Sequence, residues 1–323
     1  MLSLGGGLLA TGYAALRSPQ NSLVARRGWA LGSDVAMTVE CDSTEWAARA
    51  LDAAFAELET VERVMSLYRP DSQVCRLNQD KVLADPHPYL IEVLVAAATM
   101  SRQSGGAFDI TVQPLWDLHS KCRHSGRLPT DAQLEVARRA VDWTGVEIGA
   151  DVIRLRKPAG CITLNGIAQG FAADRALAAL QAAGIERALV NAGEIASLGG
   201  KTRVQPWTAG IQHPREPDAY SSVVSLDGRS LATSGDYETT FTADFSHNHI
   251  FDPRTGQSPQ ELASVSIVAP SGLQADAVST AAMVLGPERT MSLVRGLPRV
   301  DAFLVWKSGV TLQTRGFPTV AVT

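Results

Sequence analysis

Two oxygen-bearing side chains four residues apart, Asp276 and Thr280, offer the first chemistry in this sequence. The segment 275–285 around them predicts a helix, and residues four apart on a helix lie on one face. A carboxylate and a hydroxyl on a common face could bind a hard cation such as Mg²⁺, which prefers oxygen ligands and keeps positions for substrate phosphates. The alternative is that Asp276 merely caps its own helix. On the spacing alone, the cap is the interpretation that we favour.

A glycine-containing turn at 163–170, Thr-Leu-Asn-Gly-Ile-Ala-Gln-Gly, is the second candidate. It is predicted to join a short apolar strand at 160–164 to a long helix at 167–183. Glycines at such a junction let the backbone approach a bulky ligand, and a helix start presents free N–H groups to phosphate oxygens. A plain structural turn explains the same pattern equally well.

Two further runs contain groups that could accept or donate a proton. Residues 232–237 include Gly235 and Asp236, and residues 249–256 read His-Ile-Phe-Asp-Pro-Arg-Thr-Gly. Asp236 could equally cap a turn after the glycine. His247 and His249 lie two apart and would share one face of a strand. No third ligand with zinc-site spacing accompanies them, which disfavours a zinc site.

The elements that must position these groups are of mixed type. Alternation at 35–40 predicts a strand, and Asp42 with Glu45 predicts a capping box for the helix that follows. Thr130 and Gln133 predict a second capping box, before a helix near 132–141. Strands and helices are interspersed without regular β-α alternation, which predicts an α+β fold of largely antiparallel sheets with flanking helices. We expect residues 28–323 to form one domain, which could have two lobes.

The composition is that of a globular protein without a nucleic-acid-binding surface. The 323 residues are 45% hydrophobic and 19% charged, with a net charge of −4 and no dominant basic patch. Nucleic acid is therefore not an expected partner, and a phosphate-rich ligand would need a metal or backbone donors to offset repulsion. The four cysteines are scattered, which favours buried thiols over a zinc site or a disulfide framework.

The N-terminal segment 1–25 resembles a truncated signal peptide. Residues 2–16 carry no charge and four glycines, and they are fewer than the roughly 20 apolar residues that a membrane-spanning helix needs. The basic segment that normally precedes such a stretch is missing. We expect export to the periplasm, with membrane association as an option; the alternative is a disordered cytoplasmic tail.

Several ordered segments together resemble one family, the FAD:protein FMN transferases of the ApbE family. The resemblance runs from about residue 30 to residue 286. Its segments are 31–33, 65–72 with 77–78, 106–116, 163–170, 191–194, 232–237, 249–256 and 276–280. The agreement of so many segments in one order makes a chance similarity improbable.

The resemblance implies an enzyme that moves FMN from FAD onto a Ser or Thr hydroxyl of an acceptor protein and releases AMP, with Mg²⁺ neutralising the pyrophosphate. The implied metal ligands are the Gly166 carbonyl, Asp276, Thr280 and Ser279. The implied contacts to FAD are Leu31, Tyr68, Ala107, Phe108, Asp109, Thr163, Gln169 and Phe251. Asp236 or His249 is implied as the base or hydrogen-bond partner of the acceptor hydroxyl.

Two positions depart from the common family pattern, which has Asp and Lys where this chain has Thr163 and Gln169. The neutral pair would retune the flavin pocket, or it would mark a FAD-binding carrier that lacks transfer activity. A further alternative is a pyrophosphatase that hydrolyses FAD to FMN and AMP. The sequence of the turn at 164–170 is similar to that found in the branch of the family that serves nitrous oxide reduction. That branch implies a membrane-associated electron-transfer or regulatory protein as the acceptor.

Overall fold

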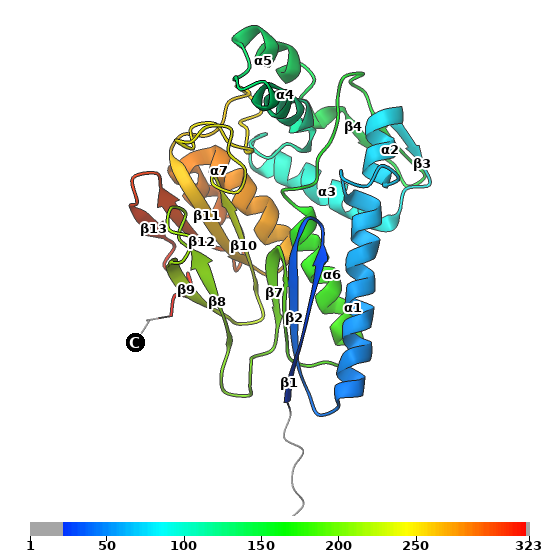
Figure 1. Cartoon of the computed structure of the whole chain (residues 1–323), viewed down its shortest axis with the longest axis vertical. Coiled ribbons are helices and arrows are strands. Elements are labelled where there is room, and N and C mark those ends of the chain that lie inside the picture. Colours follow the sequence, from blue (N-terminus) through cyan, green and yellow to red (C-terminus); the bar gives the residue numbers. More distant parts are fainter. Residues whose placement is uncertain (1–21, 321–323) are drawn as a thin grey trace, which may run out of the picture.

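A large antiparallel sheet forms the centre of the computed structural model, which describes residues 22–320. Its eight strands run in the order β1-β2-β6-β7-β10-β11-β12-β13 (Figure 1). They are β1 (Ser22–Ala30), β2 (Ser33–Cys41), β6 (Ala188–Ala192), β7 (Glu194–Leu198), β10 (Ser230–Gly235), β11 (Leu262–Ala269), β12 (Asp301–Trp306) and β13 (Thr311–Gln313). Every neighbouring pair is antiparallel. This architecture confirms the predicted mixed α+β class.

Three long helices cover one face of this sheet. They are α1 (Thr44–Met65), α6 (Ala168–Ala182) and α7 (Gly272–Arg295). The helix α1 buries Leu51 and Leu58 at helical spacing against the sheet. The helix predicted at 275–285 begins earlier, at Gly272. It bends at Gly286, where φ is 74°, directly before Pro287, because neither residue continues a regular helix.

A two-stranded hairpin covers the other face of the sheet over β10, β11 and β12. It consists of β8 (Trp207–Gln212) and β9 (Tyr220–Leu226). A second apolar core fills the space between the layers, with members that include Trp207, Ile211, Val224, Val268 and Phe303. Covered on both faces, β11 is buried along its whole length.

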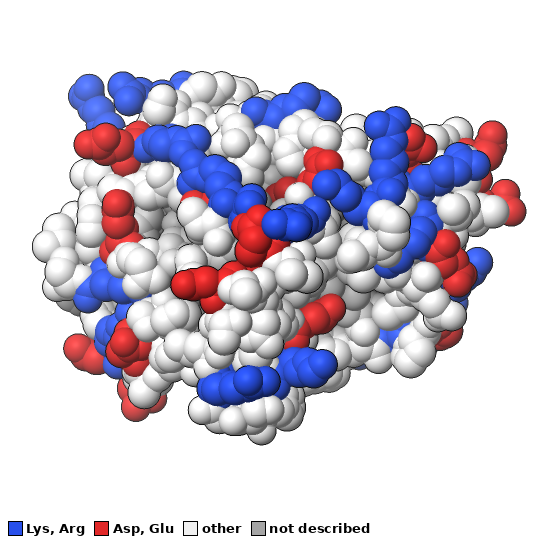
Figure 2. All heavy atoms as spheres, turned by 90° about the horizontal axis from the view of Figure 1, so that it is seen from above, with Lys and Arg blue, Asp and Glu red and all other residues white. Residues whose placement is uncertain are grey.

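Shorter elements gather at one end of the large sheet. They are α2 (Gln73–Asp80), α3 (Pro88–Gln103), η1 (Ile110–Val112), α4 (Gln113–His124), α5 (Asp131–Arg138), η2 (Trp143–Gly145) and a small sheet of β3 (Val82–Ala84), β5 (Val152–Leu155) and β4 (Val146–Ile148). The main apolar core is continuous from the large sheet into this group. Seen from this end, Figure 2 shows acidic and basic side chains interspersed over the surface rather than gathered by sign.

Two local predictions were wrong. The segment 160–164 belongs to no strand. The side chain of Asn78 takes the place of a neighbouring strand, because its amide bonds both the N–H and the carbonyl of Ile162, at 2.7 and 2.8 Å. The cap of α1 is Ser43 rather than Asp42, and its hydroxyl accepts a hydrogen bond from the N–H of Trp46 at 3.2 Å.

Other predictions were confirmed or fall partly outside the described residues. The capping box at Thr130 and Gln133 is present in both directions. Residues 22–25 of the predicted N-terminal segment belong to β1, so the boundary expected between 25 and 28 falls inside a strand. The rest of that segment, residues 1–21, lies outside the described residues. All four cysteines are free thiols as predicted, but only Cys41 and Cys122 are buried, whereas Cys75 and Cys161 are half-buried.

Candidate active site

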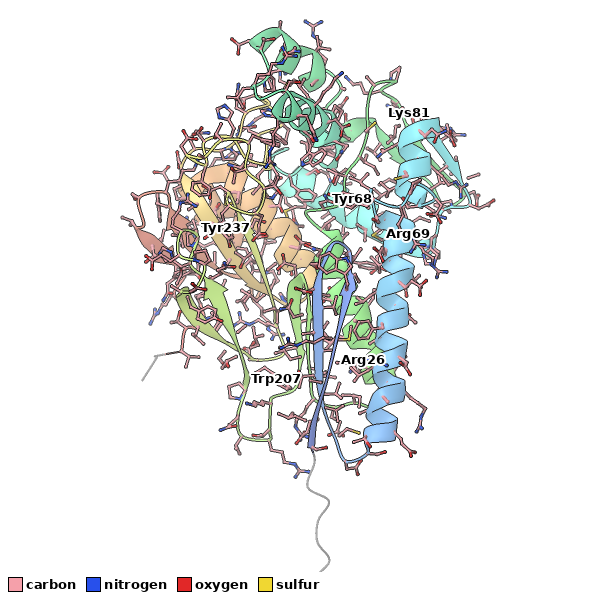
Figure 3. All side chains as sticks on the ribbon, in the orientation of Figure 1. Arg26, Tyr68, Arg69, Lys81, Trp207 and Tyr237 are labelled. Atoms are coloured by element: carbon pink, nitrogen blue, oxygen red, sulfur yellow. The ribbon has the colours of Figure 1, made fainter. Side chains whose placement is uncertain are left out.

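A cavity of about 470 Å³ lies where the tip of the β1–β2 hairpin, the start of α6, the β6–β7 turn and the end of β10 meet. Almost all the predicted site residues line it: Leu31, Tyr68, Ala107, Phe108, Asp109, Thr163, Gly166, Gln169, His249, Phe251, Asp276 and Thr280. Only Asp236 and Ser279 do not. Tyr68 is 73% exposed and lies at the rim, between the end of α1 and the hairpin tip (Figure 3).

One corner of the cavity brings the start of α6 against α7. The Thr280 hydroxyl lies 3.5 Å from the Gly166 carbonyl oxygen and 3.2 Å from the Ser234 hydroxyl. A Cβ atom at Gly166 would lie 2.7 Å from the Thr280 hydroxyl oxygen, so only glycine permits this approach.

Asp276 does not cap its own helix, whose N-cap is Ser271. Its carboxylate instead accepts a hydrogen bond from the N–H of Gly170 at 3.0 Å and so caps the first turn of α6. The sequence-based preference for a local cap was therefore wrong. One of the N–H groups expected to face phosphate is already used by this carboxylate.

The same corner contains two acidic side chains, Asp276 and Glu194, whose charged forms are disfavoured in this environment. Burial raises the pKa of Asp276 to about 7. Burial, followed by the nearby Asp276 carboxylate, raises the pKa of Glu194 well above its usual value. Both side chains line the cavity together with Glu238, so a cation would relieve their mutual repulsion.

The available donors are all oxygens: the Asp276 carboxylate, the Thr280 hydroxyl and the Gly166 carbonyl. Such a donor set fits a hard cation such as Mg²⁺. Within residues 22–320, no three His, Cys, Asp or Glu side chains lie together as a metal site. A cation here would therefore depend on the hydroxyl and the backbone carbonyl as well as the carboxylate.

Ser279 supports this corner from behind rather than facing the cavity. Its hydroxyl donates to the Asp276 carbonyl at 2.9 Å and lies 2.8 Å from the Ser234 hydroxyl. The side chain is fully buried. In this arrangement Ser279 positions α7 against β10, and the structure does not support it as a metal ligand.

Asp236 is in the wrong place for the role of base. Its side chain is 0% exposed and accepts two hydrogen bonds from the Arg215 guanidinium, at 2.7 and 2.8 Å. The ammonium group of Lys307 lies 3.6 Å away. Both carboxylate oxygens are thus bound by cations outside the cavity, and the structure does not bring Asp236 to the site as predicted.

His249 is the imidazole that does face the cavity. Its Nδ1 lies 3.3 Å from the carbonyl oxygen of Thr239, so Nδ1 carries the proton and Nε2 is left as an acceptor. Burial lowers the pKa of His249 below its ordinary 6.5, which keeps the ring neutral. His247 does not line the cavity, and its Nδ1 contacts the Ser246 hydroxyl at 2.9 Å.

The residues predicted to contact FAD differ in whether their polar groups already have hydrogen-bond partners within the protein. Asp109 accepts hydrogen bonds from the Thr111 N–H and hydroxyl, at 2.7 and 2.6 Å, and so caps η1. Thr163 donates its N–H to the Ile110 carbonyl at 2.8 Å and directs no charge into the cavity. Gln169 reaches the Ser33 hydroxyl at 3.4 Å, which ties α6 to the β1–β2 hairpin tip.

Glu194 is an acidic cavity residue that was not among the predicted site residues. It follows Gly193, where φ is 92° and the Gln169 side chain fills the space of a Cβ. Its carboxylate accepts a hydrogen bond from the N–H of Thr233 at 3.1 Å. The only indication of this role in the sequence was its place next to a glycine in the segment 191–194, which resembles a segment of the family.

A neutral imidazole in the same cavity as an acidic, oxygen-lined corner is compatible with metal-assisted chemistry on a phosphate ester. Comparison with known proteins makes this class specific. The ApbE family profile matches residues 31–304. The chain therefore belongs to the ApbE family.

Individual relatives agree with this assignment. The chain is 32% identical to the FAD:protein FMN transferase of Klebsiella pneumoniae, over 80% of this chain and 77% of that protein. It is 30% identical to the one of Salmonella typhimurium, with the same coverage. The crystal structure of the flavinyl transferase ApbE from Pseudomonas stutzeri, in the apo form, is 31% identical. The structural match covers 92% of this chain and 96% of that chain, with a TM-score of 0.80.

Proposed function

We propose that this chain is a FAD:protein FMN transferase that attaches FMN to a Ser or Thr hydroxyl of an acceptor protein and releases AMP. The observation that carries the proposal is one cavity in which the Gly166 turn, the Asp276–Thr280 face of α7 and the His249 imidazole all take part. Membership of the family and the names of its relatives support the same chemistry.

A magnesium ion is proposed for the corner formed by Asp276, Thr280 and the Gly166 carbonyl. When bound, it would neutralise charge on the FAD pyrophosphate. The raised pKa of Asp276 supports this proposal, because a buried carboxylate without a counter-charge favours either a proton or a cation. The oxygen-only donor set favours Mg²⁺ over zinc.

The proposed reaction is a displacement at the phosphorus atom on the FMN side of FAD. The acceptor hydroxyl oxygen bonds to this phosphorus, and the bond to the AMP oxygen breaks. The hydroxyl proton passes to Nε2 of neutral His249, the free acceptor nitrogen of that ring. The start of α6 and the glycine turn hold the phosphates by backbone approach.

The location and the acceptor remain parts of the proposal. Export to the periplasm is supported by the uncharged segment at 2–16, and a membrane-associated electron-transfer or regulatory protein is the proposed acceptor. No helix within residues 22–320 is long and apolar enough to cross a membrane.

Intact mass spectrometry of the acceptor tests the function. Candidate acceptor domains are incubated with the enzyme, FAD and Mg²⁺, and the expected result is a mass gain of one FMN phosphodiester. The gain should be lost with Asp276→Ala and kept with Glu59→Ala, an exposed carboxylate of α1 outside the cavity. Tightly bound, intact FAD without any mass gain would favour a carrier, and Thr163 and Gln169 would then be reverted to Asp and Lys.

A further inference from the structure

The ion pair that removes Asp236 from the cavity joins separate layers of the molecule. Arg215 lies in the connection between β8 and β9, and Lys307 directly follows β12. Both cations reach Asp236, with the Arg215 contact bidentate at 2.7 and 2.8 Å. A bidentate guanidinium–carboxylate pair fixes direction as well as distance.

The same two cations also hold Phe245. The Arg215 guanidinium lies over the Phe245 ring, 4.0 Å from its centroid. The Lys307 ammonium donates to the Phe245 carbonyl at 2.9 Å. Phe245 has a φ of 59°, a left-handed conformation that a bulky residue adopts only where its surroundings impose it.

Asp236 and Phe245 are two fixed points on the long connection from β10 to β11, the 236–261 loop. This loop contains no helix or strand within the described structure. Backbone hydrogen bonds fix parts of it locally, such as the one from the His249 N–H to the Thr239 carbonyl at 3.0 Å, and side-chain contacts tie it to the other layers of the molecule. It supplies the cavity with Glu238, His249, Ile250 and Phe251. Tyr237, next to the first fixed point, lies near the end of β10 (Figure 3).

We infer that Arg215 is a positioning residue for the reaction: it holds the 236–261 loop so that His249 faces the substrate. The inference rests on the proposed function. Arg215 does not line the cavity and therefore acts only through the loop. Its partner Asp236 also adds negative charge near His249, which offsets part of the effect of burial on that imidazole.

The test compares Arg215→Gln with Arg229→Gln. Arg229 also has two carboxylate partners, Asp227 and Asp301, each at 2.8 Å, and it lies away from the loop. Its side chain is more deeply buried, 8% exposed against 28% for Arg215, so it is a demanding control for general stability. A displacement of about 1 Å at a reacting group costs about 100-fold in rate. We expect Arg215→Gln to lower kcat for FMN transfer by about 10- to 100-fold while the Kd for FAD stays within about threefold.

Two further readouts separate positioning from general stability. Hydrogen exchange of the loop amides at 236–261 should rise in Arg215→Gln and not in Arg229→Gln. Arg215→Lys, which keeps the charge and loses the bidentate fork, should recover only part of kcat. If Arg215→Gln does not fold, Asp236→Asn should give the same loop exchange and rate loss.

Equal rate losses in the Arg215 and Arg229 variants, or unchanged loop exchange in Arg215→Gln, would overturn the inference. Failure of the proposed function looks different, because the wild-type enzyme itself would then transfer no FMN. The exchange measurement does not depend on transfer and still decides whether Arg215 holds the loop.

Discussion

At the scale of single residues, the two candidate bases, His249 and Asp236, differ in the hydrogen bonds that they already make within the protein. His249 has one ring nitrogen on the Thr239 carbonyl and the other without a partner among residues 22–320, and burial keeps the ring neutral. Asp236 has both carboxylate oxygens bound by Arg215. A base must present an accepting atom to its proton donor, and of these two residues only His249 lines the cavity.

Replacing the imidazole should remove the base and leave the pocket intact. We expect His249→Asn to lower the rate of FMN transfer by about 10²- to 10⁴-fold, the usual contribution of a general base. FAD binding, followed by flavin fluorescence, should change little. His247→Asn is the matched control, two residues away and outside the cavity, and should keep nearly full activity. Equal activity in both variants would contradict the assignment of His249.

The pairing of Asp276 with Thr280 could be predicted because both lie on one helix, where spacing alone fixes the face. The fate of Asp236 could not, because its partner Arg215 lies on another layer of the fold. Glu194 was missed for the same reason. Its burial depends on packing between β7, β10 and α7, which no local pattern reveals.

At the scale of elements, the metal corner depends on how closely α6 and α7 approach. Gly170 and Gly272 face each other at this crossing, and a Cβ at Gly170 would lie 2.1 Å from the Gly272 carbonyl oxygen. Asp174 strengthens the contact by accepting hydrogen bonds from the N–H groups of Gly272 and Leu273, at 2.7 and 2.9 Å. Each helix start is thus capped by a carboxylate of the other helix.

A methyl group at this crossing should force the helices apart. We expect Gly170→Ala to lower the free energy of unfolding by about 1–3 kcal/mol, the range for overpacked interiors, and to weaken Mg²⁺-dependent activity. Urea unfolding measures the first effect and a Mg²⁺ titration the second. Gln181→Ala, at an exposed position of α6, serves as the control. A midpoint equal to that of the wild type would show that the crossing tolerates a side chain.

Some elements follow from local signals and others do not. The capping box at Thr130 needs only its own turn, and it was predicted correctly. The strand β1 was not predicted, since Arg26 and Gly28 interrupt its apolar pattern. Tertiary contacts explain both residues. The Phe55 ring of α1 occupies the Cβ position of Gly28, and the Arg26 guanidinium lies over the same ring.

At the scale of the whole molecule, a buried imidazole joins the α4 region to the 236–261 loop. His119 is 1% exposed and packs between Phe241 and Phe251, with ring centroids 5.1 and 4.9 Å apart. Neither ring nitrogen has a hydrogen-bond partner among the described residues. Burial, followed by repulsion from His247, lowers the pKa of His119 to about 4.

This imidazole should make stability depend on pH. Below its ordinary pKa of 6.5 the unfolded chain binds a proton at His119, whereas the folded chain does not until about pH 4. The free energy of unfolding is therefore highest above pH 6.5, where His119 is neutral in both states. It falls as the pH is lowered to 4, by up to about 3 kcal/mol, at roughly 1.4 kcal/mol per pH unit.

Urea unfolding of the wild type and of His119→Phe across this range measures the effect. Asp174, whose pKa burial raises to about 6, titrates in the opposite sense but is common to both proteins. The difference between them thus isolates His119. We expect the phenylalanine variant to gain relative stability towards pH 4. Parallel curves would show that the imidazole is not held neutral by the fold.

The central claim is that FMN leaves FAD for a protein hydroxyl rather than for water. The most direct measurement is a product balance: AMP, free FMN and acceptor-bound flavin, quantified after reaction of the enzyme with FAD, Mg²⁺ and a panel of membrane-associated electron-transfer domains. We predict AMP and acceptor-bound FMN in equal amounts, with no free FMN. Equal amounts of AMP and free FMN, with the acceptors unmodified, would contradict the account and identify a pyrophosphatase.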